Sequence, residues 1–213
     1  MKQPLSFKSI KNFLKQMKET KEYIGEYLDL YQVHSATFDS GILTNKDVHE
    51  AMHKFRMENN GCALGLSVSG TVQDDIIREA MKISVGNVKL FDSVQCTFNI
   101  LEQKPSQALL EAYESGMDII IKEGMANGRV FSCSGIQTHA TSSSSIDQLA
   151  LGCIINQPFQ PRVLSGAVTS EQLVSNFKAF DVQKDTEELS IIMKDCIMDS
   201  KTYWKDRSNL VWN

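Results

Sequence analysis

A histidine near the end of an apolar run is the first residue whose type and position could do chemistry. The run is LDLYQVHS, residues 28–35, and it brings His34 to its far end. Buried strands of a parallel sheet read as nearly continuous apolar runs, and barrel enzymes keep their active sites where such strands end. Histidine changes charge near neutral pH, so His34 could transfer a proton. A histidine that only satisfies hydrogen bonds at a strand end is an equally open interpretation.

Two junctions between a strand and a helix could bind an anion. The first is LSVSGTVQDD, residues 66–75, and the second is LSGAVTSEQLVSN, residues 164–176. A helix N-terminus offers unpaired N–H groups and the positive end of the helix dipole, and Gly166 would let an anion approach the backbone. Neither junction has the G-x-G-x-x-G spacing, and the chain has no P-loop. The structural alternative is that a Ser or Thr here only caps the helix.

The other histidines favour structural interpretations. His49 and His53 have the i, i+4 spacing of a helical metal pair, but no carboxylate or cysteine accompanies them at motif spacing. An exposed helix face is therefore expected there, with no metal site. His139 lies in the Ser/Thr-rich stretch 132–145, which reads as a flexible loop with a solvated histidine.

Strand-like and helix-like segments alternate along the chain, and this rhythm predicts a parallel sheet wrapped by helices. The predicted strands are residues 28–34, 63–69, 91–98, 118–122 and 162–165. The predicted helices are residues 45–58, 72–83, 106–113, 170–180 and 186–201. Residues 2–18 hold five lysines and no acid, and Phe7, Ile10, Phe13, Leu14 and Met17 share one helical face. A helix that packs this face on the next strand is expected there; a transit segment is the alternative, although such segments favour arginine.

Composition narrows the class of protein. The 213 residues are 42% hydrophobic and 23% charged, which is ordinary for one globular domain, here expected over residues 1–213. A net charge of −4 gives no reason to expect nucleic acid or an anionic membrane as a partner. The five cysteines are scattered, with no CxxC pair, which indicates reduced thiols and a cytoplasmic location. No apolar run approaches the roughly 20 residues of a membrane span.

Together, these pieces resemble the aldo-keto reductase superfamily. Four segments agree in order and spacing: YLDLYQVHSAT at 27–37, FDSVQCTFNILEQ at 91–103, IIIKEGMANGRV at 119–130 and VLSGAVTSEQLVSNFKAF at 163–180. The resemblance covers roughly residues 20–182, apart from the Ser-rich stretch. It implies a (β/α)8 TIM barrel that binds NADP(H) across the C-terminal ends of its strands and transfers a hydride to an aldehyde or ketone.

The resemblance also implies roles for single positions. His34 matches the catalytic histidine, which orients the substrate carbonyl. Ser69 and Gln95 match contacts to the nicotinamide carboxamide, although the usual asparagine after the serine is Gly70 here. Lys122 stands where many members place a tyrosine that stacks on the nicotinamide. From the residues alone, Gln95 could instead satisfy backbone groups at a strand end.

For the adenosine half of the cofactor, the implied contacts all lie in one loop and the helix after it. Gly166, Ala167, Val168 and Thr169 match the loop around the 2′-phosphate of NADP. Gln172 replaces an arginine found in many members, and Asn176 matches an adenine contact. Lys122, by contrast, has the structural alternative of an ion pair with Glu123 or Asp92.

Several parts that the family carries have no match in this sequence. Its catalytic aspartate, tyrosine and lysine lie on the first three barrel strands, whereas the five strands predicted here begin with the histidine strand. We therefore expect an incomplete barrel of about five parallel strands, truncated and catalytically impaired, whose open edges could make copies associate. A small carbonyl compound is the expected substrate. The alternatives are a non-catalytic nucleotide-binding or regulatory subunit and a non-functional fragment.

Overall fold

The structure, a computed structural model, describes residues 10–141, 144–182 and 185–211. The chain forms two compact units, and each is described by itself. The first unit comprises Met1–Gln95 and Glu111–Asp118, and the second comprises Cys96–Leu110 and Ile119–Asn213. The expectation of a single domain stays a prediction.

A parallel sheet of five strands confirms the predicted α/β class. Its strands are β1 (Leu30–Val33), β2 (Ala63–Ser67), β5 (Ser93–Thr97), β6 (Asp118–Lys122) and β7 (Arg162–Val163), in the order β1-β2-β5-β6-β7. The order begins with β1 and ends with β7, so the described strands do not form a closed barrel. Each strand lies where the hydrophobic pattern predicted one, although most are shorter than expected.

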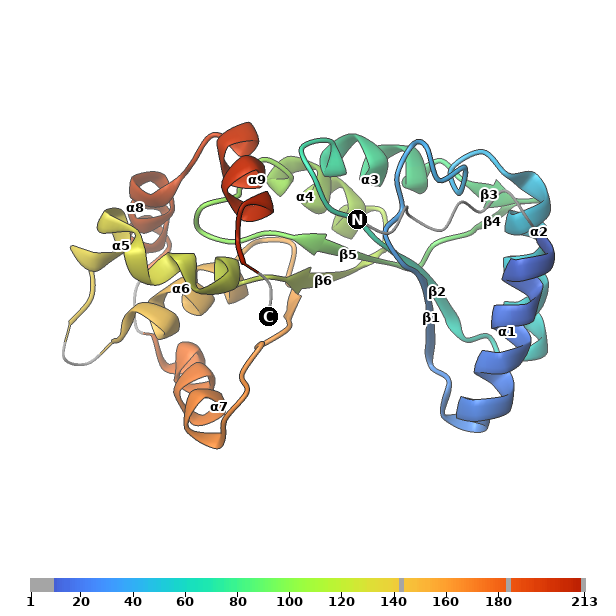
Figure 1. Ribbon diagram of the computed structural model, residues 1–213, viewed down its shortest axis with the longest axis horizontal. Coiled ribbons are helices and arrows are strands. Elements are labelled where there is room, and N and C mark those ends of the chain that lie inside the picture. Colours follow the sequence, from blue (N-terminus) through green and yellow to red (C-terminus); the bar gives the residue numbers. More distant parts are fainter. Residues whose placement is uncertain (1–9, 142–143, 183–184, 212–213) are drawn as a thin grey trace. The chain divides into compact units, whose positions relative to one another are not determined.

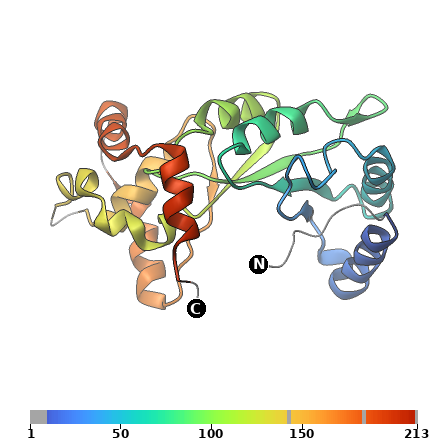
Figure 2. The same ribbon diagram turned by 45° about the horizontal axis from the view of Figure 1, so that its top comes forward.

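In the first unit, β1 and β2 pair in parallel, and β2 pairs in parallel with β5. Three helices accompany them: α1 (Ile10–Ile24), α2 (Lys46–Glu58) and α3 (Gln73–Met81). Figures 1 and 2 show α1 lying beside α2, on which it packs. A short hairpin of β3 (Ser84–Val85) and β4 (Val88–Lys89) was not predicted.

Helix α1 confirms that the N-terminal apolar face packs inside the unit. Phe13 and Met17 are buried, whereas Leu14 is about half exposed. The Phe13 ring lies edge-on to Tyr31, and Tyr31 in turn contacts Phe55 of α2. Phe7 lies outside the described residues.

The second unit holds most of the remaining helices. They are α5 (Ser134–Gln137), α6 (Ile146–Ile155), α7 (Ser170–Phe177), α8 (Thr186–Cys196) and α9 (Ser200–Ser208), with α4 (Ser106–Glu114) divided between the units. The apolar helix α6 contacts both α7 and α8, which lie near it in Figure 1. Its buried residues make it the core of this unit. Each helix of the described residues falls short of the length and hydropathy that a membrane span requires.

Three expectations about this region are wrong in detail. The helix predicted over 186–201 is two helices, because Ile197 is extended and Asp199 caps α9. The Ser-rich stretch contains α5, and its last residue, Ser145, forms a capping box at the start of α6. His139 lies in the turn after α5 but is not simply solvated, since its Nε2 lies 2.8 Å from a carboxylate oxygen of Asp195.

The predicted exposed face of α2 is also wrong at one position. His49 is buried, and its ring nitrogen Nε2 hydrogen-bonds the carbonyl oxygen of Ile42 in the loop before the helix. A pattern of i, i+4 spacing could not reveal this, because the loop that covers His49 comes from the preceding segment. Within the described residues, no three His, Cys, Asp or Glu side chains are grouped so that they could hold a metal ion.

Candidate functional site

His34 lies in a tight turn immediately after β1, at the carboxyl end of the first unit's sheet. Ser35 follows it with a left-handed backbone (φ 54°), and its hydroxyl lies 3.0 Å from His34 Nδ1. The chain then returns to the sheet, where the Ala36 N–H donates to the Ser67 carbonyl at 2.8 Å. The His34 side chain is exposed, so a small molecule can reach its imidazole.

Polar side chains on three neighbouring strands come together beside this turn. Ser67 of β2 and Gln95 of β5 are register partners, and the Ser67 hydroxyl donates to Gln95 Oε1 at 3.3 Å. The Gln95 amide in turn lies 3.5 Å from Gln32 Oε1 on β1. Gln95 therefore bonds side chains and does not merely satisfy backbone groups through its amide.

Gln32 and Ser67 are site residues that the sequence reasoning missed. The signal was present, because Gln32 precedes His34 by two residues and Ser67 precedes Ser69 by two. Alternate residues of a strand share a face of the sheet, so each predicted site residue pointed to a polar neighbour. The Nε2 atom of Gln32 is buried and has no hydrogen-bond partner among the described residues.

A glycine makes room for this polar cluster. A Cβ atom at Gly65 would lie 2.3 Å from Ser93 Oγ and 3.1 Å from Gln32 Nε2. Ser93 Oγ is also buried and without a hydrogen-bond partner within the described part of the chain. Buried polar atoms are nearly always paired, so these two mark a place where a bound molecule or water would be stabilised.

Ser69 lies between β2 and α3, in the first of the two junctions. The N–H of Val68 donates to the Gln95 carbonyl at 2.8 Å, which keeps this junction beside the end of β5. Gly70 adopts φ 97°, a left-handed conformation that glycine allows without strain. Val72 is the N-cap of α3, and its side chain makes no capping bond.

Lys122 ends β6 in the second unit, and burial lowers its pKa from the ordinary value, against the opposing effect of Glu123. The two carboxylates suggested as its partners both bind arginines. Glu123 accepts two hydrogen bonds from Arg207 of α9, one of them 2.8 Å long. Asp92, in the first unit, accepts one from Arg56 at 2.6 Å.

The second junction forms a loop that α7 holds in place. Gly166 has φ 66°, and the N–H of Ala167 donates back to Ser165 Oγ at 3.2 Å. Asn176, near the end of α7, donates through its amide to the same Ser165 Oγ at 2.9 Å. The predicted adenine contact is therefore also the residue that joins helix to loop.

Thr169 caps α7, as the structural interpretation of this junction expected. Its side chain accepts the Gln172 N–H at 3.2 Å. The Gln172 side chain folds back, and its carbonyl oxygen accepts the Val168 N–H at 2.9 Å. These two hydrogen bonds hold the tip of the loop against the first turn of α7.

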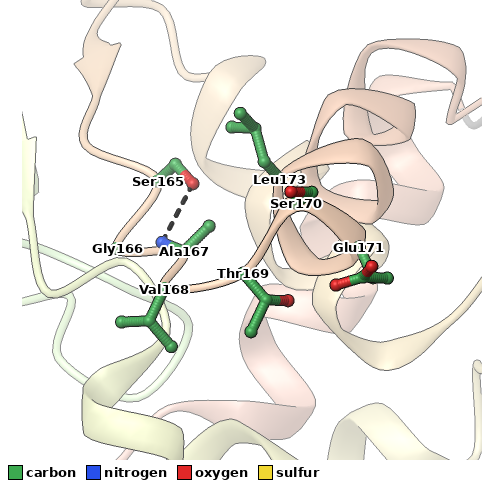
Figure 3. Close-up of a pocket in the computed structure, with 8 residues that line it drawn as sticks. All are labelled: Ser165, Gly166, Ala167, Val168, Thr169, Ser170, Glu171 and Leu173. Atoms are coloured by element: carbon green, nitrogen blue, oxygen red, sulfur yellow. Dashed lines mark hydrogen bonds between the residues drawn. The ribbon is translucent and has the colours of Figure 1, made fainter.

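A cavity of about 580 Å³ lies along this loop and the first turn of α7 (Figure 3). It is lined by Ser165, Gly166, Ala167, Val168, Thr169, Ser170, Glu171 and Leu173. The loop predicted for the adenosine half of a cofactor thus borders an open cavity. His34, Ser69 and Gln95 belong to the first unit, and Lys122, Gly166–Thr169, Gln172 and Asn176 to the second.

No protein-family profile and no curated protein matches the sequence. Among solved structures, the apo form of an aldo-keto reductase from Bacillus halodurans matches with a TM-score of 0.71 and 20% identity, covering 92% of this chain and 72% of that one. Its holo form matches with a TM-score of 0.69, covering 89% and 69%. The aldose reductase of Giardia lamblia matches with a TM-score of 0.65 and 18% identity, covering 90% and 71%. Over most of its length the chain therefore has the fold of the aldo-keto reductases, as a partial version with five parallel strands.

Proposed function

We propose that this chain is an aldo-keto reductase-like oxidoreductase that binds a nicotinamide dinucleotide and acts on a small aldehyde or ketone. The observation that carries the proposal is the position of His34, exposed at the carboxyl end of a parallel strand in a chain with the aldo-keto reductase fold. Active sites of α/β barrels gather at these strand ends. NADP(H) is the form that the sequence resemblance implies, and it stays a prediction.

The polar cluster of the first unit supports a role in holding the cofactor. Ser67 and Gln95 are joined by a hydrogen bond, and Gln32 contributes a buried amide nitrogen that has no protein partner among the described residues. A carboxamide is a natural ligand for such groups, because it offers both a donor and an acceptor. Ser69 and Gln95 would orient the nicotinamide, and the loop at 165–169 would bind the adenosine half. The dinucleotide supplies a hydride when it is bound.

His34 would then donate a hydrogen bond to the carbonyl oxygen of the substrate. Its Nδ1 faces the Ser35 hydroxyl, which helps to set the orientation of the ring. An imidazole placed in this way polarises a carbonyl and assists proton transfer, a contribution of about 10²–10⁴ in rate.

Turnover by these 213 residues should nevertheless be slow. Tyr31, on the strand that leads into the His34 turn, packs between Phe13 and Phe55, and burial raises the pKa of its hydroxyl. It therefore faces the helices and does not supply a second acid beside His34. This observation favours the second candidate function, a non-catalytic nucleotide-binding subunit, or a chain without function of its own.

Calorimetric titration of the full chain with NADH and NADPH, followed by turnover assays with small aldehydes and ketones, tests the proposal. We expect binding of a dinucleotide and slow turnover that falls by about a hundredfold in His34→Gln. His139→Gln, a histidine paired with Asp195 in the second unit, is the control and should keep the turnover. Binding without turnover would favour the non-catalytic candidate, and absence of binding would overturn the proposal.

Two further expectations belong with this function. We propose a cytoplasmic location on the ground that five scattered cysteines with no CxxC pair are typical of a reducing compartment. Association of copies through the outer strands β1 and β7 also stays a prediction. Sedimentation at several protein concentrations tests it, and a constant monomer mass would contradict it.

A further inference from the structure

The charge of the cavity along the loop at 165–169 and the first turn of α7 indicates which dinucleotide would bind there. Its eight lining residues include one carboxylate, that of Glu171, and neither lysine nor arginine. The arginine nearest along the chain, Arg162, does not line this cavity but an adjoining, more apolar one of about 380 Å³, which shares Ser165 and Leu173 with it. The surface offered to the adenosine ribose is therefore acidic.

Three N–H groups of this loop and of the start of α7 already donate to acceptors within the chain. Ala167 donates to Ser165 Oγ and Val168 donates to the Gln172 side chain. The N–H of Gln172 donates to the Thr169 hydroxyl. A phosphate that approached these three N–H groups would have to displace their acceptors.

The Glu171 carboxylate is ionised at neutral pH. Its own backbone N–H and the Thr169 hydroxyl lower the pKa of this carboxyl below the ordinary value. Figure 3 shows Thr169 and Glu171 at the start of α7, among the residues that line the cavity. The group is exposed, so water and salt weaken its field at a distance but leave short-range hydrogen bonding intact.

An ionised carboxylate and a 2′-phosphate repel each other, because both are negatively charged. A phosphate monoester carries roughly −1.5 to −2 charges near pH 7, and it is usually met by arginine. A carboxylate instead accepts a hydrogen bond from a free 2′-hydroxyl, which is how many dinucleotide sites select the unphosphorylated cofactor. The side chains that line the cavity at 165–173 include a carboxylate that can accept a hydrogen bond from a 2′-hydroxyl. They include no arginine that could bind a 2′-phosphate.

We propose that the loop at 165–169 and the first turn of α7 select NAD(H) over NADP(H), with Glu171 accepting a hydrogen bond from the 2′-hydroxyl of the adenosine ribose. This inference rests on the proposed function, since it concerns the same cofactor. It differs from the NADP(H) that the sequence resemblance implies. The difference arises because Gln172 brings no positive charge and because Glu171 brings a negative one.

Binding constants of the full chain for NADH and NADPH, measured by calorimetry at one ionic strength, test the selection. We expect NADH to bind about tenfold more tightly. Glu171→Gln should reduce this preference to within about threefold, and Val168→Arg should tighten NADPH binding by about tenfold, because Val168 is 86% exposed and can accept a longer side chain. Glu187→Gln removes an exposed acid from the first turn of α8 and should leave the preference unchanged.

Two mononucleotides separate the possible failures. Adenosine 5′-phosphate and its 2′-phosphorylated analogue probe the adenosine half of the site alone. Absence of binding by every dinucleotide and mononucleotide overturns the proposed function and the selection together. Equal or tighter binding of NADPH, with dinucleotide binding intact, overturns the selection only. A preference for NADH that survives in Glu171→Gln overturns the role of that carboxylate.

Discussion

The side-chain amide of Asn176 donates a hydrogen bond of 2.9 Å to the hydroxyl of Ser165 and a longer one of 3.3 Å to the Ser165 carbonyl. Asn176 lies near the end of α7, whereas Ser165 lies in the loop before that helix. These two hydrogen bonds join the loop to the end of α7, and we call them the clamp. The bonds of Thr169 and Gln172 join the loop to the start of the same helix. The shape of the cavity depends on this arrangement.

Asn176→Ala should loosen the loop. Because both amide hydrogen bonds are lost, the free energy of unfolding should fall by about 1–2 kcal/mol, and nucleotide binding should weaken more than tenfold. Urea denaturation and calorimetric titration measure the two effects. Asn12→Ala, an exposed position on α1, is the matched control. Nucleotide binding at full strength in Asn176→Ala would show that the clamp does not shape the site.

Gly65→Ala should destabilise the first unit. The new Cβ would lie 2.3 Å from Ser93 Oγ, and overpacking of this kind costs about 1–3 kcal/mol. Ser93→Ala removes that oxygen, which is buried without a hydrogen-bond partner among the described residues. The double variant should therefore recover most of the lost stability in urea denaturation. If Ser93→Ala does not rescue Gly65→Ala, the contact is not the cause of the loss.

Glu123→Gln should weaken the attachment of α9 to the end of β6. Arg207 donates two hydrogen bonds to this carboxylate, and the pair is largely shielded from water. Loss of one charged partner should lower the free energy of unfolding by about 2 kcal/mol. Hydrogen exchange of α9 should rise at the same time. In the double variant with Arg207→Met the loss should be smaller than the sum of the two single losses, and strict additivity would contradict the coupling.

Asp147 should make the stability of the second unit depend on pH. Burial raises the pKa of its carboxyl, but hydrogen bonds from Ser145, Ser175 and backbone N–H groups outweigh this and lower it below 3.8. The bond from Ser175, 2.6 Å long, joins α7 to α6. Since the folded-state pKa is the lower one, the stabilisation is fully present above the unfolded-state pKa.

The stabilisation that the Asp147 carboxylate provides is lost as the pH falls through its folded-state pKa. Thermal denaturation of Asp147→Asn against the unsubstituted chain should show a deficit at pH 7 that shrinks below about pH 4. A deficit that stays constant over this range would exclude the carboxylate as its cause. Asp39→Asn, in an exposed loop of the first unit, is the control.

The sequence determined the strands of the parallel sheet, most of the helices and their order. Apolar runs located all five strands of the parallel sheet, and that of β6 agrees with the predicted range at both ends. Capping chemistry located Thr169 at the start of α7, because a Thr hydroxyl bonds the backbone only a few residues away. These features depend on interactions within one segment, so the local pattern contains the information that specifies them.

Only the tertiary structure decided which side chains meet. Gln32 and Gln95, 63 residues apart, share one face of the sheet, and Glu123 and Arg207 are 84 residues apart. His49 is buried by the loop around Ile42, and His139 finds Asp195 on α8. The sequence motif likewise could not show that the N–H groups of Ala167 and Val168 donate to side chains of the same loop and helix. Periodicity gives the face of an element, but the partner on that face depends on how distant segments pack, since hydrogen bonds and charges act over only a few ångströms.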